Sequence, residues 1–528
     1  MDQHLPPLQR PGIQSPADIP RAHARSRPDH PALVFEGRVS TYRQWDQRCS
    51  QAAQALMAAL PVQGRCAYLA KNADRFFDLY MAAAKSRRVL VAVNWRLAPP
   101  EIAFILDDAE AELVFVDQLH APVLQALRGQ LPRVRMVVCI DGPADGCIGY
   151  DDWLAPHAPV DPALPALADD TVLQMYTSGT TGMPKGVQMS NRNLVGNLSK
   201  IDSGDLGPWR EDDIALAPLP QFHVGGAGYG LYPLYAGGTC VILREANAAL
   251  ILQAFRELPI TKMGLVPAVM GLILNHPDCA TADFSRLDTV TYGASPIPVD
   301  LLERALATFK CGFVQMFGMT ESTSIGTVLS PSDHDPQRPQ RLTSCGRPAT
   351  GVELKIAGAD GVALPAGETG EILLRGHFIT KGYWRKPEAT AAAIRDGWYH
   401  TGDAGYVDAE GYLYLRDRIK DMVISGGENV YPAEVESALS RHPGIADVAV
   451  IGVPDDKWGE AVKAVVVPRA GHTLDPQEVL AFARQHIAGF KCPKSIDIVE
   501  ALPRNASGKL LKRVLREPDW QGRTRSIN

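Results

Sequence analysis

The chain has 528 residues, of which 46% are hydrophobic and 21% are charged, and its formal net charge is −6. This length predicts roughly three to four core-bearing units of a globular protein, and the weakly acidic balance gives no electrostatic basis for binding nucleic acid. Nine scattered cysteines without a C-x-x-C pair argue against a zinc site and against a disulfide framework. No signal-peptide core and no membrane-spanning apolar run is present, so we expect a cytoplasmic protein.

Strands alternate with helices over much of the chain. Residues 87–117 predict a strand, a helix that begins near Pro99 and a second strand, and similar alternation recurs at 261–276 and 287–318. This order predicts parallel α/β layers. Ligands in such sheets bind beyond the carboxyl ends of the strands, which is where 293–296 and 318–321 are expected.

The sequence pattern changes from about residue 345, where short predicted strands are separated by glycines. This pattern predicts a small β-rich subdomain, and a compact α/β segment follows it to the end of the chain. We therefore expect an α/β protein with a large N-terminal domain, 1–417, made of layered α/β subdomains and the β-rich subdomain. A smaller C-terminal α/β domain is expected at 418–528.

The stretch "YTSGTTGMPKG", residues 176–186, combines glycines, hydroxyl groups and Lys185. These groups suit a polyphosphate. The order differs from a Walker A loop, because Met183 and Pro184 precede the lysine and a predicted strand, 187–190, follows it before a helix at 191–201. Taken alone, the stretch is equally compatible with a flexible surface turn.

Seven motifs follow one another in a fixed order: "YTSGTTGMPKG", "PLPQFHVGG", "YGAS", "QMFGMTE", "WYHTGD", "LRDRIKDMVISGGENVYPAEVE" and "PRNASGKL". Together they resemble the acyl-adenylate-forming superfamily over nearly the whole chain, and they look most like bacterial fatty-acyl-CoA ligases. The resemblance implies that ATP is cleaved between its α and β phosphates and that AMP is joined to a carboxylate. The acyl group would then pass to coenzyme A, and residues 176–186 would hold the triphosphate.

The resemblance also implies an ATP site with Mg²⁺. Thr177 and Glu321 would contact the cation through hard oxygen atoms, and Thr320 would hydrogen-bond the α-phosphate. Asp403 would accept hydrogen bonds from the ribose hydroxyls, and Arg418 would hold the same sugar. The remaining implied ATP-binding residues are Ser178, Gly179, Thr180, Thr181, Gly182, Lys185, Gly293, Ala294, Ser295, Gln315, Phe317, Gly318 and Lys509, with Gly293, Ala294 and Ser295 forming a wall beside adenine.

Two lysines are expected to divide the reaction between them. Lys509 would stabilise charge on the α-phosphate during adenylation, although without the resemblance it reads as an ordinary tail lysine. Lys420 would be the hinge about which a mobile C-terminal domain rotates before the thiol of coenzyme A attacks. After that rotation, Gly426 and Gly427 would leave room for the pantetheine arm.

The acyl pocket is expected at Phe222, His223, Val224, Gly225 and Gly226. By resemblance His223 belongs with the catalytic residues, and the alternative is a hydrogen-bonded core histidine. It stands where amino-acid-activating relatives have an aspartate, which argues against an α-amino acid substrate. The small residues at 225–228 and 230, with no charged group among them, favour an unbranched aliphatic acid of at least medium length.

Three alternatives stay open at this point. The substrate could be an aromatic or cyclic carboxylic acid, or the acyl group could pass to a carrier protein instead of coenzyme A. A non-catalytic protein that binds nucleotide and acyl group is the third, and the intact motif residues argue against it. The sequence does not decide whether the protein forms a homodimer or touches a membrane peripherally.

Overall fold

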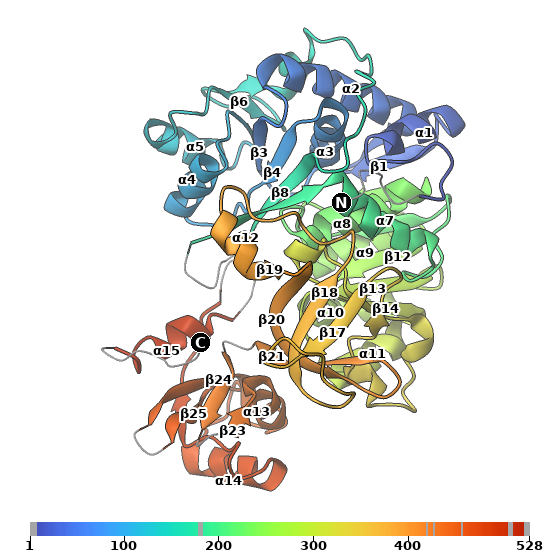
Figure 1. Cartoon of the computed structure of the whole chain (residues 1–528). Helices are drawn as coiled ribbons and strands as arrows, with labels where there is room; N and C mark the ends of the chain where they lie inside the picture. Colours follow the sequence, from blue (N-terminus) through green and yellow to red (C-terminus); the bar gives the residue numbers. More distant parts are fainter. Residues whose placement is uncertain are drawn as a thin grey trace. The chain divides into compact units, whose positions relative to one another are not determined.

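The computed structural model describes residues 8–177, 183–418, 421–425, 428–455, 458–504 and 510–521. The chain divides into two compact units, the first made of Met1–Leu354 with Leu374–Tyr399 and the second of Lys355–Leu373 with His400–Asn528 (Figure 1). The expected domain boundary between residues 417 and 418 stays a prediction.

A seven-stranded sheet forms one half of the first unit, in the order β7-β6-β5-β3-β4-β8-β9. All neighbours are parallel except β8 and β9. The strands are β3 (Arg65–Leu69), β4 (Val89–Ala92), β5 (Leu113–Val116), β6 (Met136–Cys139), β7 (Ile148–Gly149), β8 (Thr171–Thr177) and β9 (Lys185–Ser190). The elements predicted at 87–117 are confirmed as β4, α4 and β5, and β3 lies between the two strands.

Helices cover both faces of this sheet. The helices of this part of the chain are α1 (Asp18–Ser26), α2 (Tyr42–Ala59), α3 (Asp74–Ser86), α4 (Pro99–Asp108), α5 (Ala121–Leu127), α6 (Tyr150–Leu154) and α7 (Asn191–Asp202). Apolar residues of β3 to β6 pack with α4 and α5 on one face. On the other face Tyr68 of β3 meets Phe76 of α3, with 5.2 Å between the ring centroids.

A nine-stranded sheet forms the other half of the first unit, in the order β16-β15-β14-β13-β12-β10-β11-β1-β2. The six strands from β14 to β1 are parallel and the outer ones antiparallel. The strands are β1 (Pro31–Phe35), β2 (Arg38–Thr41), β10 (Ile214–Ala217), β11 (Thr239–Ile242), β12 (Lys262–Leu265), β13 (Thr289–Gly293), β14 (Gly312–Phe317), β15 (Thr327–Leu329) and β16 (Arg347–Pro348).

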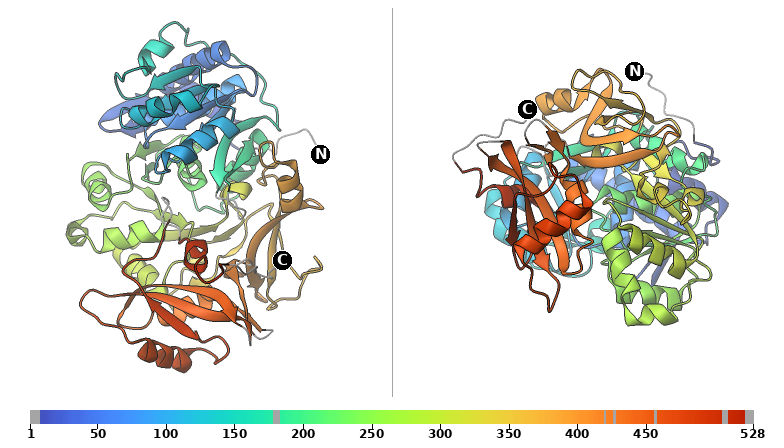
Figure 2. Two further views of the ribbon diagram at one scale, coloured as in Figure 1. Left: turned by 90° about the vertical axis from the view of Figure 1, so that its left-hand side faces the viewer. Right: turned by 90° about the horizontal axis from the view of Figure 1, so that it is seen from below.

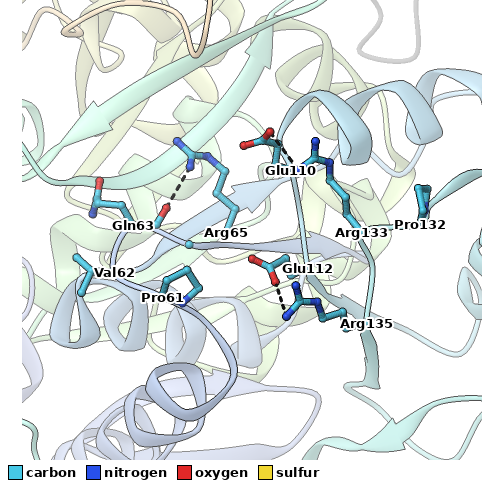
Figure 3. A pocket seen from close by; sticks show the side chains of 10 residues that line it. Pro61, Val62, Gln63, Arg65, Glu110, Glu112, Pro132, Arg133 and Arg135 are labelled. Atoms are coloured by element: carbon cyan, nitrogen blue, oxygen red, sulfur yellow. Dashed lines mark hydrogen bonds and ion pairs between the residues drawn. The ribbon is translucent and has the colours of Figure 1, made fainter.

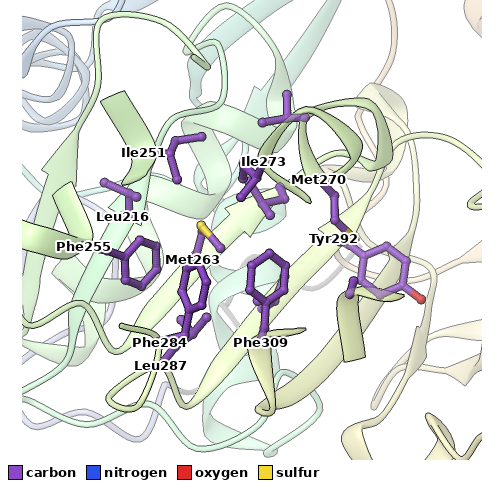
Figure 4. Close-up of a cluster of buried hydrophobic side chains, with 14 of the residues drawn as sticks. Leu216, Ile251, Phe255, Met263, Met270, Ile273, Phe284, Leu287, Tyr292 and Phe309 are labelled. Carbon is purple, nitrogen blue, oxygen red and sulfur yellow. The ribbon is translucent and has the colours of Figure 1, made fainter. Parts of the chain in front are cut away.

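The helices of this half are α8 (Val224–Ala236), α9 (Ala248–Glu257), α10 (Pro267–Leu274) and α11 (Val299–Phe309). Figure 4 shows the core between this sheet and its helices, where Met263 of β12 lies among Ile251, Phe255 and Phe309. The strand and helix predicted at 261–276 and the strand, helix and strand predicted at 287–318 are confirmed.

The expected β-rich part is a five-stranded sheet in the order β17-β18-β20-β19, with β21 paired to β20. Its elements are β17 (Glu353–Ala357), β18 (Gly370–Arg375), α12 (Pro387–Ala393), β19 (Ile394–Arg395), β20 (Trp398–Val407) and β21 (Leu413–Arg418). This sheet confirms the β-rich character predicted for the chain from about residue 345.

The compact C-terminal segment contains a second five-stranded sheet, ordered β23-β22-β25-β24 with β26 paired to β25. Its elements are β22 (Val423–Ser425), β23 (Glu428–Val430), α13 (Pro432–Leu439), β24 (Ile445–Asp455), β25 (Gly459–Pro468), α14 (Pro476–His486), β26 (Ser495–Ile498) and α15 (Lys512–Arg516). Apolar residues of α13 and α14 pack on one face of this sheet. Figure 2 shows the ribbon of the chain in two further views. Among the helices of the described ranges, none has the length and apolar character needed to cross a membrane.

Candidate active site

Two of the predicted site residues come from different sheets and meet. Thr177 is the last residue of β8, and Glu321 lies in the short turn Thr320–Ser322 that follows β14. The Thr177 hydroxyl donates a hydrogen bond of 3.4 Å to Oε1 of Glu321. The carboxyl ends of parallel strands from the two sheets therefore face a shared point, which is the position that such strands offer to a ligand.

The Glu321 residue is 8% exposed, and its carboxylate accepts hydrogen bonds from neutral hydroxyl groups. Tyr383 donates the second of these to the same Oε1 atom, at 3.0 Å. Within the described ranges no basic side chain pairs with this carboxylate, and its Oε2 atom makes no hydrogen bond. A carboxylate with little exposure needs a compensating positive charge, and the described residues supply none to Glu321.

The oxygen donors at this point fit a magnesium ion. Mg²⁺ is usually bound through one or two carboxylates together with substrate phosphates, and Glu321 with the Thr177 hydroxyl supplies the protein's share of such a set. Across the described residues no group of three or more His, Cys, Asp or Glu side chains could hold a metal ion by itself. The donor set therefore suits a cation that arrives with phosphate.

The turn that carries Glu321 has an unusual backbone. Thr323 and Ser324 are both left-handed, with φ of 50° and 67°. The turn is held by a hydrogen bond of 2.7 Å from the Thr323 hydroxyl to the Phe378 carbonyl, and by another of 2.7 Å from the Asn197 amide to the Thr323 carbonyl. Strained backbone held by surrounding contacts is typical of functional sites, and here the contacts hold the turn that carries Glu321.

Lys185 opens β9, and its Nζ atom lies 5.2 Å from the ring centroid of Tyr383. In the described part of the chain no carboxylate pairs with this lysine, so its charge is available to phosphate. Burial and the neighbouring charge of Glu321 raise the pKa of the Tyr383 phenol, which therefore stays protonated and donates. Tyr383 is a site residue that the sequence does not predict, although the aromatic residue in "GYWRK" is a visible signal.

Several residues expected to bind ATP lie at the carboxyl ends of the adjacent parallel strands β13 and β14. Those expected beside adenine are Gly293, Ala294 and Ser295, and the neighbouring residues expected to bind ATP are Gln315, Phe317 and Gly318. A Cβ atom at Gly293 would lie 2.4 Å from the Met316 carbonyl oxygen, so close packing of the two strands already requires this glycine. The Gln315 side chain is buried, and its Oε1 atom has no hydrogen-bond partner among the described residues.

The loop that precedes α8 is held by two amide side chains. The Asn72 amide donates to the Leu219 carbonyl at 3.0 Å, and its Oδ1 atom accepts from the Gln221 backbone N–H at 2.9 Å. Gln221 in turn accepts from the Ala73 N–H at 2.9 Å. These bonds fix the neighbouring Phe222 as a buried residue and place the next residue at the start of the helix.

His223 is an exposed residue, although many protein atoms surround its ring. Its ring centroid is 4.5 Å from that of Phe222. Desolvation and the positive charge of Arg96 lower its pKa to about 4. The Arg96 guanidinium lies 4.8 Å from the Trp95 ring centroid and 5.8 Å from that of Phe222. The expectation that no charge lies by the acyl pocket is therefore incomplete, since Arg96 comes from another part of the chain.

The glycine run after His223 is a helix, and its glycines serve two different purposes. At Gly225 a Cβ atom would meet nothing within 4 Å, and at Gly228 it would meet only Ser324 Oγ at 3.9 Å. At Gly226 it would lie 2.0 Å from the Pro220 carbonyl oxygen, and at Gly230 2.2 Å from Cζ of Phe77. The small residues of the run therefore leave only one face of α8 open, the face that carries Gly225 and Gly228.

The second unit carries the residue expected to bind ribose. Asp403 lies on β20 with little exposure, and its backbone pairs with that of Arg418 on β21. Its N–H donates to the Thr401 hydroxyl at 3.0 Å. Of the other expected site residues, Ser178, Gly179, Thr180, Thr181, Gly182, Lys420, Gly426, Gly427 and Lys509 lie outside the described residues, as does the side chain of Arg418.

A separate pocket of about 380 Å³ lies at the amino ends of strands of the seven-stranded sheet, opposite to the end at which Thr177 lies (Figure 3). It is lined where β3, β5 and β6 begin, whereas Thr177 lies where β8 ends. Arg133 pairs with Glu110 and Arg135 with Glu112, each at 3.2 Å. Because its charges are largely paired and it lies away from the carboxyl ends of the strands, this pocket is not part of the candidate active site.

Comparison with known proteins identifies the class. The model of the AMP-binding enzyme family matches residues 20–384, and that of the AMP-binding enzyme C-terminal domain matches residues 434–509. The chain belongs to the AMP-binding enzyme family. It is an AMP-forming acid–thiol ligase, as the motif series predicts.

Individual relatives differ in the acid that their names give. A fatty acid–[acyl-carrier-protein] ligase, ScoC, of Streptomyces coeruleorubidus is 38% identical over 525 residues, covering 99% of each chain. A feruloyl-CoA synthase of an Amycolatopsis species is 39% identical over 501 residues, covering 93% of this chain and 96% of the relative. The structure of a Mycobacterium tuberculosis fatty acyl CoA synthetase matches with a TM-score of 0.76 at 34% identity, over 96% of this chain and 98% of that one.

Proposed function

We propose that the protein activates a medium- or long-chain fatty acid. The acid and ATP would give acyl-AMP and pyrophosphate, and coenzyme A would then displace AMP to give acyl-CoA. The observation that carries this proposal is the open face of α8, where Gly225 and Gly228 have no side chain and no neighbour closer than 3.9 Å to an added Cβ. A slender apolar chain can lie against such a face, and burial of its methylenes supplies the binding energy.

The first half-reaction would use the residues where the two large sheets meet. Glu321 and Thr177 would hold Mg²⁺, which neutralises phosphate charge when bound. Lys185 would contact the phosphates directly, and Thr320 would hydrogen-bond the α-phosphate. With the negative charge balanced, the carboxylate of the fatty acid can approach the α-phosphorus atom.

The second half-reaction would use residues of the C-terminal segment. In this proposal residues 418–528 rotate about Lys420 after adenylation, which withdraws Lys509 and brings Gly426 and Gly427 to the pantetheine arm. His223 would line the channel through which the thiol arrives, in its neutral form. The cytoplasmic location expected from the sequence also stays a prediction.

Two observations favour specific alternatives. The aromatic residues Trp95 and Phe222, whose ring centroids lie 6.2 Å apart beside the loop, would suit a planar acid, and one relative is named a feruloyl-CoA synthase. Another relative, similar over 99% of both chains, is named for transfer to an acyl carrier protein. The experiment must therefore separate the acid from the thiol acceptor.

The acid is tested by acid-dependent exchange of pyrophosphate into ATP, measured for a series of straight-chain fatty acids beside benzoate and a cinnamate. Each added methylene that is fully buried contributes about 0.8 kcal/mol, so kcat/KM should rise roughly three- to fourfold per carbon until the channel ends. An aromatic acid that exceeds every fatty acid by more than tenfold would contradict the aliphatic proposal.

The acceptor is tested separately with the best acid. Thioester formation is measured with coenzyme A and with a phosphopantetheinylated acyl carrier protein at equal concentrations. We expect coenzyme A to be the better acceptor. A clear preference for the carrier protein would leave the adenylation chemistry intact and change the product.

A further inference from the structure

Tyr383 lies in a short segment that is hydrogen-bonded to β9. Its backbone bridges that of Val187 in antiparallel fashion. The Trp384 backbone N–H donates to the Gly186 carbonyl at 2.7 Å, and the Gln188 N–H donates to the Gly382 carbonyl at 3.2 Å. These bonds tie the position of Tyr383 to the strand that Lys185 opens.

The next residue of this segment, Trp384, is anchored through its side chain as well. Its indole N–H donates to the Asp108 carbonyl at 3.0 Å. The Arg65 guanidinium lies over the Trp384 ring, 3.2 Å from its centroid. The backbone that carries Tyr383 is thus held both by β9 and by the Trp384 side chain, which limits the freedom of the segment.

The Tyr383 side chain contacts both charged groups of the candidate phosphate site. Its hydroxyl donates to Glu321 Oε1 at 3.0 Å, and its ring lies 5.2 Å, measured from the centroid, from Nζ of Lys185. The Tyr399 side chain lies near the Tyr383 hydroxyl and opposes part of the rise in its pKa. Tyr383 therefore contacts both Glu321 and Lys185.

We propose that Tyr383 is a positioning residue for the cation and the phosphates of ATP. Its hydrogen bond holds Oε1 of Glu321, so that Oε2, which makes no hydrogen bond in the described part of the chain, is presented to the cation. Its ring holds the Lys185 ammonium near the same point by a cation–π contact. This inference rests on the proposed function, because it assigns Glu321 to Mg²⁺ and Lys185 to phosphate.

The hydroxyl group and the ring have separable effects. Hydrogen bonds to an ionised carboxylate are about twice as strong as those between neutral groups, so the hydroxyl controls the direction of Glu321. The ring fills space and faces the lysine, and phenylalanine keeps both properties. Tyr383→Phe therefore removes the carboxylate contact alone, whereas Tyr383→Leu removes the carboxylate contact and the aromatic face.

The test uses Mn²⁺ as a spectroscopic probe, with α,β-methylene-ATP to prevent cleavage. Binding of Mn²⁺ to the whole protein is followed by electron paramagnetic resonance. We expect Tyr383→Phe to weaken Mn²⁺ binding by about fivefold or more, while the KM for the acid changes by less than about twofold. Tyr383→Leu should weaken binding of the analogue further. The matched control is Tyr150→Phe, whose hydroxyl is buried and has no partner among the described residues.

A double-mutant cycle tests whether Tyr383 affects Mn²⁺ binding by way of the Glu321 carboxylate. In a Glu321→Gln background, Tyr383→Phe should weaken Mn²⁺ binding by less than about twofold, because the group that it positions is no longer charged. An equal effect in both backgrounds would overturn the proposal, and so would unchanged Mn²⁺ binding in Tyr383→Phe. If Tyr383→Phe does not fold, Tyr399→Phe replaces it and should weaken Mn²⁺ binding in the same direction.

Failure of this inference differs from failure of the proposed function. If the native protein binds Mn²⁺ with the analogue and Tyr383→Phe loses that binding, Tyr383 positions the cation even when no fatty acid is activated. If a fatty acid is activated and Mn²⁺ binding is unchanged in Tyr383→Phe, the proposed function stands and the positioning role does not.

Discussion

The Thr177 hydroxyl and the Glu321 carboxylate approach to 3.4 Å although they belong to two different sheets. Thr177 ends β8 of the seven-stranded sheet, and Glu321 follows β14 of the nine-stranded sheet. A cation bound by both residues would therefore join the two halves of the first unit. This relationship makes the residues testable as a pair.

Replacing Thr177 by valine should lower adenylation at limiting Mg²⁺ by about tenfold to a hundredfold, because the change removes an oxygen donor and leaves the shape of the side chain. Excess Mg²⁺ should recover part of the loss. Thr177→Ser keeps the hydroxyl and should stay within a few fold of the native rate. The measurement is pyrophosphate exchange as a function of Mg²⁺ concentration. A loss that is equal at all Mg²⁺ concentrations would argue against a cation contact.

The pKa of His223 is lowered to about 4, so we expect a neutral ring in the native protein at pH 7. An unfolded chain takes up this proton near a pKa of about 6.5, so between about pH 6.5 and pH 4 the unfolded state binds more protons. The contribution of His223 to stability is therefore present above the unfolded pKa and is lost as the pH falls through that range.

Arg96→Ala should raise the pKa of His223 by removing a nearby positive charge. Nuclear magnetic resonance titration of the histidine rings measures this directly. His334 is the internal control, because desolvation lowers its pKa to about 4 and Arg96 is not among the causes. A His223 ring that titrates near its unperturbed pKa of about 6.5 in the native protein would contradict the prediction.

Lys509→Ala should abolish acyl-adenylate formation and leave thioester formation from synthetic acyl-adenylate largely intact. The reason is that its charge is needed only while phosphate is displaced. The two half-reactions are measured separately, by pyrophosphate exchange and by thiol consumption. Lys512→Ala is the matched control, since that lysine pairs with Glu436 at 2.8 Å. Equal losses in both half-reactions of Lys509→Ala would rule out the assigned role.

Lys420→Pro should show the reverse pattern. Proline fixes φ, which should hinder rotation of the C-terminal segment and slow thioester formation while adenylation continues. Lys420→Ala is the control, because it removes the charge and keeps the backbone free. Full overall turnover in the proline variant would place the hinge elsewhere in the chain.

The sequence predicts the strand ends well and the contacts between distant segments poorly. Thr177 and Glu321 are predictable because each stands in a recognisable motif at the end of a strand-like segment. Tyr383 is not, because its value as a site residue depends on a contact with Glu321, 62 residues away in the chain. Arg96 escapes prediction for the same reason, since only folding brings it close to His223.

The glycines of α8 show the same limit within a single motif. The residues at 225–230 are glycine or alanine apart from Tyr229, so the sequence does not distinguish one glycine of the run from another. Which face of the helix is packed depends on Pro220 and Phe77, and neither contact can be predicted from the run itself. The structure therefore separates the glycines of this motif into those on an open face of α8 and those on a packed face.

That division gives the last prediction, which compares two neighbouring glycines of α8. Gly226→Ala places a methyl group 2.0 Å from the Pro220 carbonyl oxygen. The backbone must therefore shift, and we expect a loss of about 1–3 kcal/mol in the free energy of unfolding. Gly225→Ala places its methyl group where nothing lies within 4 Å. Alanine has a higher helix propensity than glycine, so this variant should be no less stable than the native protein.

The same two variants should differ in their effect on the substrate. The Gly225→Ala methyl group extends from the open face of α8, so it should narrow the acyl channel and lower kcat/KM for the longest fatty acids more than for short ones. Gly226→Ala should lower activity for all chain lengths in proportion to the fraction unfolded. Chemical denaturation gives the stabilities, and pyrophosphate exchange with the fatty-acid series gives the chain-length profiles. A native chain-length profile in Gly225→Ala would show that the acyl chain does not run along this face of the helix.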